Sequence, residues 1–202
     1  ALKDYKNGLL EVISQPATMG YTLITGLIFG AFMVYLSGSQ QIFHEQYGLK
    51  EEFPMIFALL SIAIGVAIFI NGHMVLRFGM KRIVAIALYG FFGISLISFC
   101  LYYQNPNPTI QWLLFFFSAQ FFAIGFLFGN LRALAMQPMG HIAGMAAAIT
   151  GFISTLMALP LSTYIGQFIS TSVWPIFLGF TVCGALSILL MHWIRRATKI
   201  RG

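Results

Sequence analysis

The sequence has 202 residues, of which 59% are hydrophobic and only 8% are charged. A soluble domain carries about 25% charged residues, and the surface of a small globule needs polar cover. This composition excludes a water-soluble domain and predicts that lipid solvates most of the chain. The net charge of +6 does not indicate nucleic-acid binding, because the basic residues are scattered among apolar runs.

Six apolar stretches are long enough to cross a bilayer as helices, which takes about 20 residues each. No stretch alternates polar and apolar residues, so helices are expected rather than a barrel. The predicted spans are 17–40, 54–76, 83–103, 110–132, 142–168 and 174–194. We predict an all-α membrane protein with a six-helix bundle over 17–194, a linker segment over 1–16 and a basic tail over 195–202.

Basic residues are distributed unevenly between the two sides of the predicted bundle. With six spans, ten of the eleven Lys and Arg residues fall on the side that holds both termini, and Lys50 falls on the other. Short loops rich in Lys and Arg stay in the cytoplasm. We therefore expect a multi-pass protein of the inner (cytoplasmic) membrane with both termini in the cytoplasm.

All five acidic residues lie outside the predicted spans, and no Lys lies inside one. Transporters commonly place proton relays and ion sites on ionisable groups within the membrane. If the chain takes part in ion-coupled transport, the coupling carboxylate is therefore not expected in it.

Small residues four positions apart let helix backbones approach closely. Pairs such as Gly26 with Gly30 and Gly125 with Gly129 are expected to pack inside the bundle. The fifth span instead carries two neighbouring small rows, which form a smooth face suited to rocking against a partner. The rows are Gly140, Gly144 and Ala148, and Ala143, Ala147, Gly151 and Thr155.

The segment 72–82 combines two glycines, seven residues apart, with three cations between the second and third spans. It resembles the loop signature of the major facilitator superfamily, Gly-x-x-x-Asp-Arg-x-Gly-Arg-Arg/Lys. The matching residues and the adjoining cation are Gly72, Arg77, Gly79, Lys81 and Arg82. Leu76 stands in place of the acidic residue, which removes any charge lock that this residue provides in relatives.

The stretch 130–151 is similar to the bicyclomycin-resistance (Bcr/CflA) subgroup of drug:proton antiporters within that superfamily. The matching residues are Pro138, Gly140, Ala143, Gly144, Ala146, Ala148 and Gly151. Met145 and Ala147 depart from the pattern, which has Thr and Ser there. Residues 35–39 and 47–49 resemble the same subgroup, with Gln40 where Pro is usual.

The resemblance covers nearly the whole chain, but only as the carboxyl-terminal half of a twelve-helix transporter. Such a half is a six-helix bundle made of two inverted three-helix repeats. It implies that the first and fourth spans line a central cavity, and that the second and fifth face the other bundle. It implies a small amphipathic substrate, no cofactor, and substrate contacts at Tyr21, Phe29, Tyr35, Ser37, Gln40, Phe117, Gln120 and Asn130.

The resemblance thus predicts the second half of a proton-coupled multidrug efflux transporter that works by alternating access. Segment 72–82 would help to hold one state closed on the cytoplasmic side. One bundle cannot alternate alone, so an amino-terminal six-helix half is expected in the same longer chain, in a separate chain or as a second copy. The first of these is favoured, because the sequence starts with Ala where a central linker would end.

A different class of function stays open, namely a membrane scaffold or regulatory module that does not transport; the loss of the acid at Leu76 is compatible with it. An enzyme is not expected. The sequence contains neither a Gly-x-Ser-Gly nor a His-Glu-x-x-His pattern, so neither a serine nucleophile nor a metal site is predicted.

Overall fold

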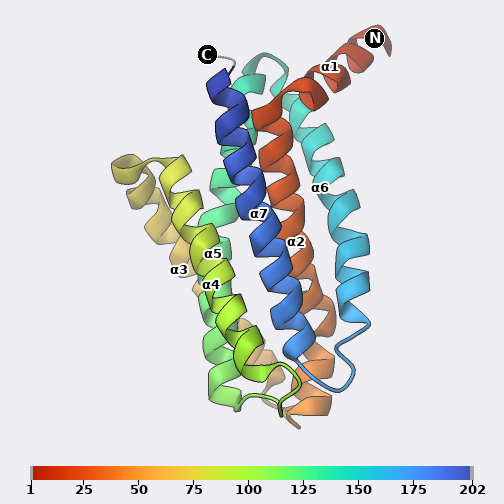
Figure 1. The fold of residues 1–202 in the computed structure, drawn as a ribbon, viewed down its shortest axis with the longest axis vertical. Coiled ribbons are helices and arrows are strands. Elements are labelled where there is room, and N and C mark those ends of the chain that lie inside the picture. The colour runs from red at the N-terminus through yellow and green to blue at the C-terminus, as the bar shows by residue number, and fades with distance from the viewer. Residues whose placement is uncertain (1, 201–202) are drawn as a thin grey trace.

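The computed structural model describes residues 2–200, and every regular element in that range is helical. In the described residues a short helix precedes six long apolar helices, with a one-turn π-helix after the first long helix and a short 3-10 helix after the fourth (Figure 1). The elements are α1 (Leu2–Ser14), α2 (Pro16–Gln41), η1 (Ile42–Gln46), α3 (Phe53–Phe78), α4 (Met80–Tyr102), α5 (Ile110–Met136), η2 (Gln137–Ile142), α6 (Ala143–Gly166) and α7 (Trp174–Ile200).

Five continuous helical stretches in the described residues are long and apolar enough to cross a membrane. One of them, Ile110–Gly166, covers 57 residues, and a straight helix of that length would extend about 85 Å. The chain instead turns back at η2, where Met139 leaves helical geometry, so α5 and α6 run in opposite directions (Figure 1). This stretch therefore supplies two crossings, and the predicted six-helix bundle is confirmed.

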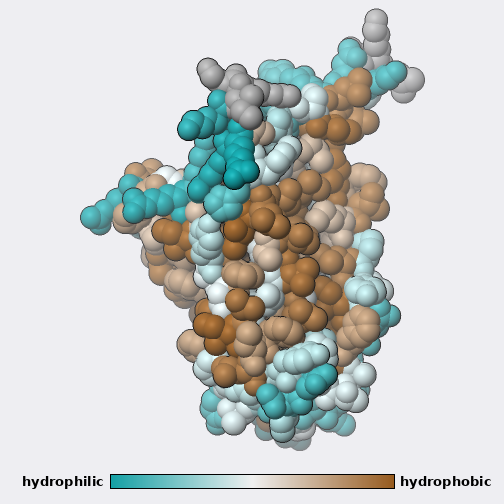
Figure 2. Space-filling view, viewed as in Figure 1, coloured by the Kyte–Doolittle hydropathy of each residue, from teal (hydrophilic) through white to brown (hydrophobic). Residues whose placement is uncertain are grey.

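The hydropathy of the surface matches a membrane environment. On the face that Figure 2 shows, hydrophobic residues cover the middle of the bundle and hydrophilic residues gather at its two ends. Local signals set several helix ends. Pro16 starts α2 in the first turn, where its missing N–H costs nothing, and the side chain of Thr109 caps α5 by accepting from the backbone N–H of Trp112.

The segments expected to form a linker at one end of the chain and a tail at the other are largely helical in the structure. Most of the 1–16 segment forms α1, and α7 continues past residue 194 to Ile200. Residues 1, 201 and 202 lie outside the described part. Helix α1 packs against α6 and α2. Val12 is buried there, and His141 Nε2 lies 2.7 Å from Glu11 Oε1.

The packing pattern has an internal symmetry. Helix α2 packs against α5, α6 and α7, while α5 packs against α2, α3 and α4. Exchanging α2 with α5, α3 with α6, and α4 with α7 maps one set of contacts onto the other. Since α2 and α5 run in opposite directions (Figure 1), the two three-helix units are inverted relative to each other. This arrangement is that of half of a major facilitator fold.

Small residues mark the closest contacts in both units. A Cβ atom placed on Gly26 or Gly30 would lie 3.3 Å from backbone atoms of α6. A Cβ on Gly125 would lie 2.7 Å from the carbonyl oxygen of Ile64 in α3. By contrast, a Cβ on Gly129 would meet open space. Equivalent close crossings, α2 with α6 and α5 with α3, therefore hold the two units together.

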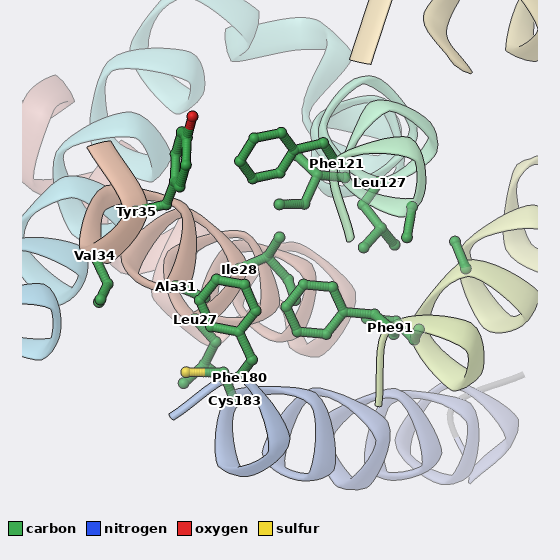
Figure 3. Packing of buried hydrophobic residues seen from close by; sticks show 14 of the residues in the cluster. Leu27, Ile28, Ala31, Val34, Tyr35, Phe91, Phe121, Leu127, Phe180 and Cys183 are labelled. Atoms are coloured by element: carbon green, nitrogen blue, oxygen red, sulfur yellow. The ribbon is translucent and has the colours of Figure 1, made fainter. Parts of the chain in front are cut away.

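Aromatic side chains fill the centre of the bundle. Phe91 of α4 and Phe180 of α7 stack with ring centroids 5.4 Å apart. Tyr35 of α2 meets Phe121 of α5 edge-on at 4.5 Å. Figure 3 shows the rings of Phe91 and Phe180 in the space between α2, α4 and α7, with Tyr35 and Phe121 near each other between α2 and α5.

The end of the bundle opposite α1 is held by hydrogen bonds between three connecting segments. Gln46 Nε2 donates to Ile169 O (2.6 Å), and Asn107 Nδ2 donates to Gln46 Oε1 (2.9 Å). The backbone N–H of Val173 donates to Asn107 Oδ1 (3.1 Å). Tyr47 donates to Pro108 O (2.8 Å), and burial, with a smaller effect of Tyr102, raises the pKa of Tyr47 above its usual value.

We predict that Gly125→Ala lowers the stability of the chain by about 1–3 kcal/mol, because the new methyl group would press on Ala67 and Ile64 of α3. The change is measured as the midpoint of thermal unfolding in detergent. Unfolding is monitored by thiol labelling of the buried Cys183, in a background where Cys100 is replaced by Ser. The matched control is Gly129→Ala, one turn further along α5, which meets no neighbour. Equal midpoints for the two variants would contradict the close crossing.

Candidate functional site

A groove between α2, α5 and α6 is lined by both polar and aromatic side chains. It has a volume of about 330 Å³, within the range of small-molecule sites. It is lined by Thr25, Phe29, Phe128, Gly129, Arg132, Gly151, Ser154 and Thr155. A smaller hollow of about 120 Å³ continues it toward the α1 end of the bundle and shares four of these residues.

The groove has an aromatic end and a cationic end. Phe29 and Phe128 meet edge-on with centroids 6.1 Å apart, and Phe32 lies at the same distance from Phe128. Arg132 lies one turn further along α5, toward its end at Met136, and lines both hollows. One end of the groove therefore suits the apolar part of a ligand, and the other end suits an anionic group.

The eight predicted substrate contacts fall into three places. Phe29 lines the groove. Ser37 and Gln40 line a separate hollow of about 430 Å³ near the far end of α2, next to the start of α3. The other five side chains are buried inside the bundle, namely Tyr21, Tyr35, Phe117, Gln120 and Asn130.

Gln120 and Asn130 form hydrogen bonds with neighbouring helices, and all five side chains are enclosed in this structure rather than lining an open cavity. Gln120 Nε2 donates to Ser95 Oγ (2.7 Å) and to Phe91 O (3.1 Å), which ties α5 to α4. Asn130 Nδ2 donates to Asn71 Oδ1 (2.7 Å), which ties α5 to α3. The first and fourth spans are the two central helices, so most of their side chains are enclosed by neighbours.

The predicted inter-bundle face of α6 is open. Gly140, Ala143, Gly144, Ala147, Ala148 and Thr155 are exposed, and Gly151 is partly exposed. A Cβ on Gly144 would have no neighbour within 4 Å, so nothing in the described part of the chain covers this face. Gly151 and Thr155 also line the groove, which places the groove at the edge of the face.

The segment 72–82 is almost entirely helical, contrary to the expected loop. Gly72 and Arg77 belong to α3, and Lys81 and Arg82 belong to α4. Only Gly79 interrupts the two helices, and its φ of +79° is a conformation that favours glycine. The guanidinium groups of Arg77 and Arg82 both lie over the ring of Phe78, at 5.4 and 5.7 Å. The outcome is a compact basic hairpin at the helix ends.

Two further hollows are apolar. One lies between α3, α4 and α5 and the other between α6 and α7, and the internal symmetry relates α3 to α6 and α4 to α7. Their linings are almost wholly hydrophobic, as lipid-facing grooves require. In residues 2–200, no three His, Cys, Asp or Glu side chains lie close enough together to hold a metal ion.

Sequence reasoning missed the central member of the groove. Arg132 was counted only among the cations that orient the bundle, because it stands at the predicted end of the fourth span. The helix continues to Met136, which brings Arg132 inside it. Thr25, Phe128 and Ser154 were also missed, because their contribution depends on which sides of α2, α5 and α6 meet.

Comparison with known proteins gives one curated relative, the uncharacterized MFS-type transporter YdgK of Bacillus subtilis (strain 168). It is 28% identical over 168 residues, which is 81% of this chain and 40% of the relative. The chain thus spans less than half the length of the relative it matches. No family model matches the sequence, and no solved structure matches it.

We predict that cysteines placed at Gly129 and Thr155 react with a water-soluble thiol reagent, whereas a cysteine at Gln120 does not. The first two positions face the groove, and Gln120 is fully buried. The measurement is the labelling rate in proteoliposomes, in a background with Cys100 and Cys183 replaced by Ser. Rapid labelling of Gln120→Cys in a correctly folded chain would show that the core opens to water.

Proposed function

We propose that this chain forms one half of a two-bundle membrane transporter that carries small amphipathic molecules by alternating access. The observation that carries the proposal is the open α6 face with the groove at its edge. A monomeric bundle surrounded by lipid has no need of a smooth row of small residues. The similarity to an MFS-type transporter, over less than half of that protein, supports the same conclusion.

The partner in this proposal is a second six-helix bundle, on the α3 and α6 side. Both helices leave much of their surface uncovered: Phe69 is 76% exposed and Phe152 is 67% exposed. The internal symmetry makes α3 and α6 equivalent, so a symmetric partner contacts both. Either another part of a longer chain, a separate chain or a second copy fits this surface.

The direction of transport is proposed as efflux across the inner membrane, with both ends of the chain in the cytoplasm. The basic hairpin of Arg77, Lys81 and Arg82 lies on the α1 side in the predicted topology, and Lys50 lies on the other side.

We further propose that proton coupling belongs to the partner bundle. Among the six apolar helices, no Asp or Glu is available to carry a proton.

Proteoliposomes that hold this chain alone are expected to show no pH-driven export of a fluorescent amphipathic compound above that of empty liposomes. The physical reason is the absence of a carboxylate from the spans. The positive control is the same chain reconstituted with an amino-terminal six-helix half. Export driven by a pH gradient in the chain-only vesicles would overturn the half-transporter proposal.

Gly144→Leu is expected to weaken pairing with the partner bundle at least tenfold, because the larger side chain would hold the α6 face away from it. Energy transfer between dyes on the two bundles in nanodiscs measures the pairing. Gly90→Leu on α4 is the matched control, since Gly90 also has open space around it and lies off the α6 face. Equal pairing of the two variants would count against the assignment of this face.

A further inference from the structure

Arg132 is an exposed cation near the end of α5, four residues before Met136, and it has no partner within the bundle. In the part of the chain that the structure describes, it forms no hydrogen bond and no ion pair. All five acidic residues lie outside the six long apolar helices, so none of them is positioned to neutralise it from a neighbouring span. A charge near hydrocarbon is costly unless an anion or water compensates it.

The hydroxyl groups around Arg132 are already engaged as donors. Thr25 Oγ1 donates to Tyr21 O (2.8 Å), and Ser154 Oγ donates to Thr22 O (3.1 Å). Only Thr155 among the hydroxyls of the groove makes no hydrogen bond. Arg132 is therefore the main free donor, and its planar guanidinium offers two parallel N–H groups that suit a carboxylate or sulfonate.

Two glycines keep this cation accessible. Gly129 precedes Arg132 by one turn on the same side of α5, and Gly151 faces it from α6. A Cβ on either glycine would have no neighbour within 4 Å. The space beside the guanidinium is therefore open and continuous with the surface formed by Phe29 and Phe128.

We propose that the groove binds an amphipathic organic anion, with its aromatic body against Phe29 and Phe128 and its acidic group on Arg132. The inference rests on the proposed transport function and names the class of substrate. The volume of about 330 Å³ accommodates a small aromatic acid. Charge at one end and rings at the other fix the orientation of that molecule in the groove.

The same chemistry, an anion on an apolar body, also describes an acidic phospholipid. The aromatic end favours a soluble aromatic anion, because edge-on rings such as Phe29 and Phe128 suit a planar ring. The experiment must therefore distinguish a soluble aromatic anion from the headgroup of an acidic phospholipid.

The test uses the 202-residue chain in phosphatidylcholine nanodiscs and two matched probes, naphthoate and the neutral naphthylmethanol. Equilibrium dialysis gives the dissociation constants. Naphthoate is expected to bind at least tenfold more tightly than naphthylmethanol. Arg132→Gln is expected to remove that preference: the binding of naphthoate weakens at least tenfold, and the dissociation constant of naphthylmethanol stays within twofold. Phe128→Ala is expected to weaken the binding of both probes.

Arg196→Gln is the matched control, since Arg196 is an exposed cation on α7 away from the groove. It is expected to leave both dissociation constants unchanged. Equal affinity for the two probes, or equal losses for both in Arg132→Gln, would overturn the proposal. Arg132→Lys distinguishes loss of the charge from loss of the fold. This variant retains the charge and is expected to keep most of the preference for naphthoate.

The lipid source is separated by replacing part of the phosphatidylcholine with phosphatidylglycerol at an ionic strength that screens the surface charge. Naphthoate binding within twofold of its original value supports a soluble anion. Loss of naphthoate binding would identify the headgroup as the occupant and overturn the proposal. Neither assay needs a pH gradient or a second bundle, so failure here leaves the transport proposal intact, and failed transport leaves the binding result intact.

Discussion

The structure depends on close approach between helix backbones at glycine. In lipid, burial of apolar side chains supplies little force between helices, because lipid tails are as apolar as leucine. The contacts of Gly26 and Gly30 with α6, and of Gly125 with α3, let backbones meet at distances where dispersion and weak polar contacts accumulate. Because the internal symmetry relates these crossings, each three-helix unit is attached to the other by the same device.

The two ends of the bundle are built differently. At the end opposite α1, Gln46 and Asn107 join three connecting segments through side-chain hydrogen bonds to backbone and to each other. At the α1 end, the basic hairpin around Gly79 stands apart from the other connections, and Leu76 is 89% exposed. Side-chain hydrogen bonds thus join the connecting segments at the first end, while the groove between α2, α5 and α6 is open toward the second.

Sequence reasoning recovered the number, order and approximate limits of the spans, because length and hydropathy determine what a bilayer accepts. It did not recover which side of each helix faces inward. Helices such as α5 are apolar all round, so Phe117 and Phe115 look alike in sequence, yet one is fully buried and the other is 56% exposed. Only the packing of α5 against α2, α3 and α4 distinguishes them. The same limit explains why Gln120 was expected to meet a substrate.

Small residues on different helices have different surroundings in this structure. Gly144 has no contact in the packing of this bundle, whereas Gly30 does. The pair Gly125 and Gly129 is divided, because Gly125 meets α3 and Gly129 meets open space, so the expectation that both pack inside the bundle is wrong for Gly129. Polar residues such as Asn130 are ambiguous, because a buried amide forms a tie between helices as readily as it binds a ligand.

The charge distribution divides the chemistry of the proposed transporter between its halves. This chain brings Arg132 into an apolar helix and keeps every carboxylate outside. A guanidinium stays protonated throughout the physiological range, so it can hold an anion but cannot release a proton. The six long apolar helices hold no Asp or Glu, so a coupling carboxylate, if export is coupled to protons, belongs to the partner bundle in this proposal. A carboxylate arriving beside Arg132 would compete with the bound anion for the same donors. Binding of the anion and ionisation of that carboxylate would then oppose each other at this groove, which links substrate binding to proton binding.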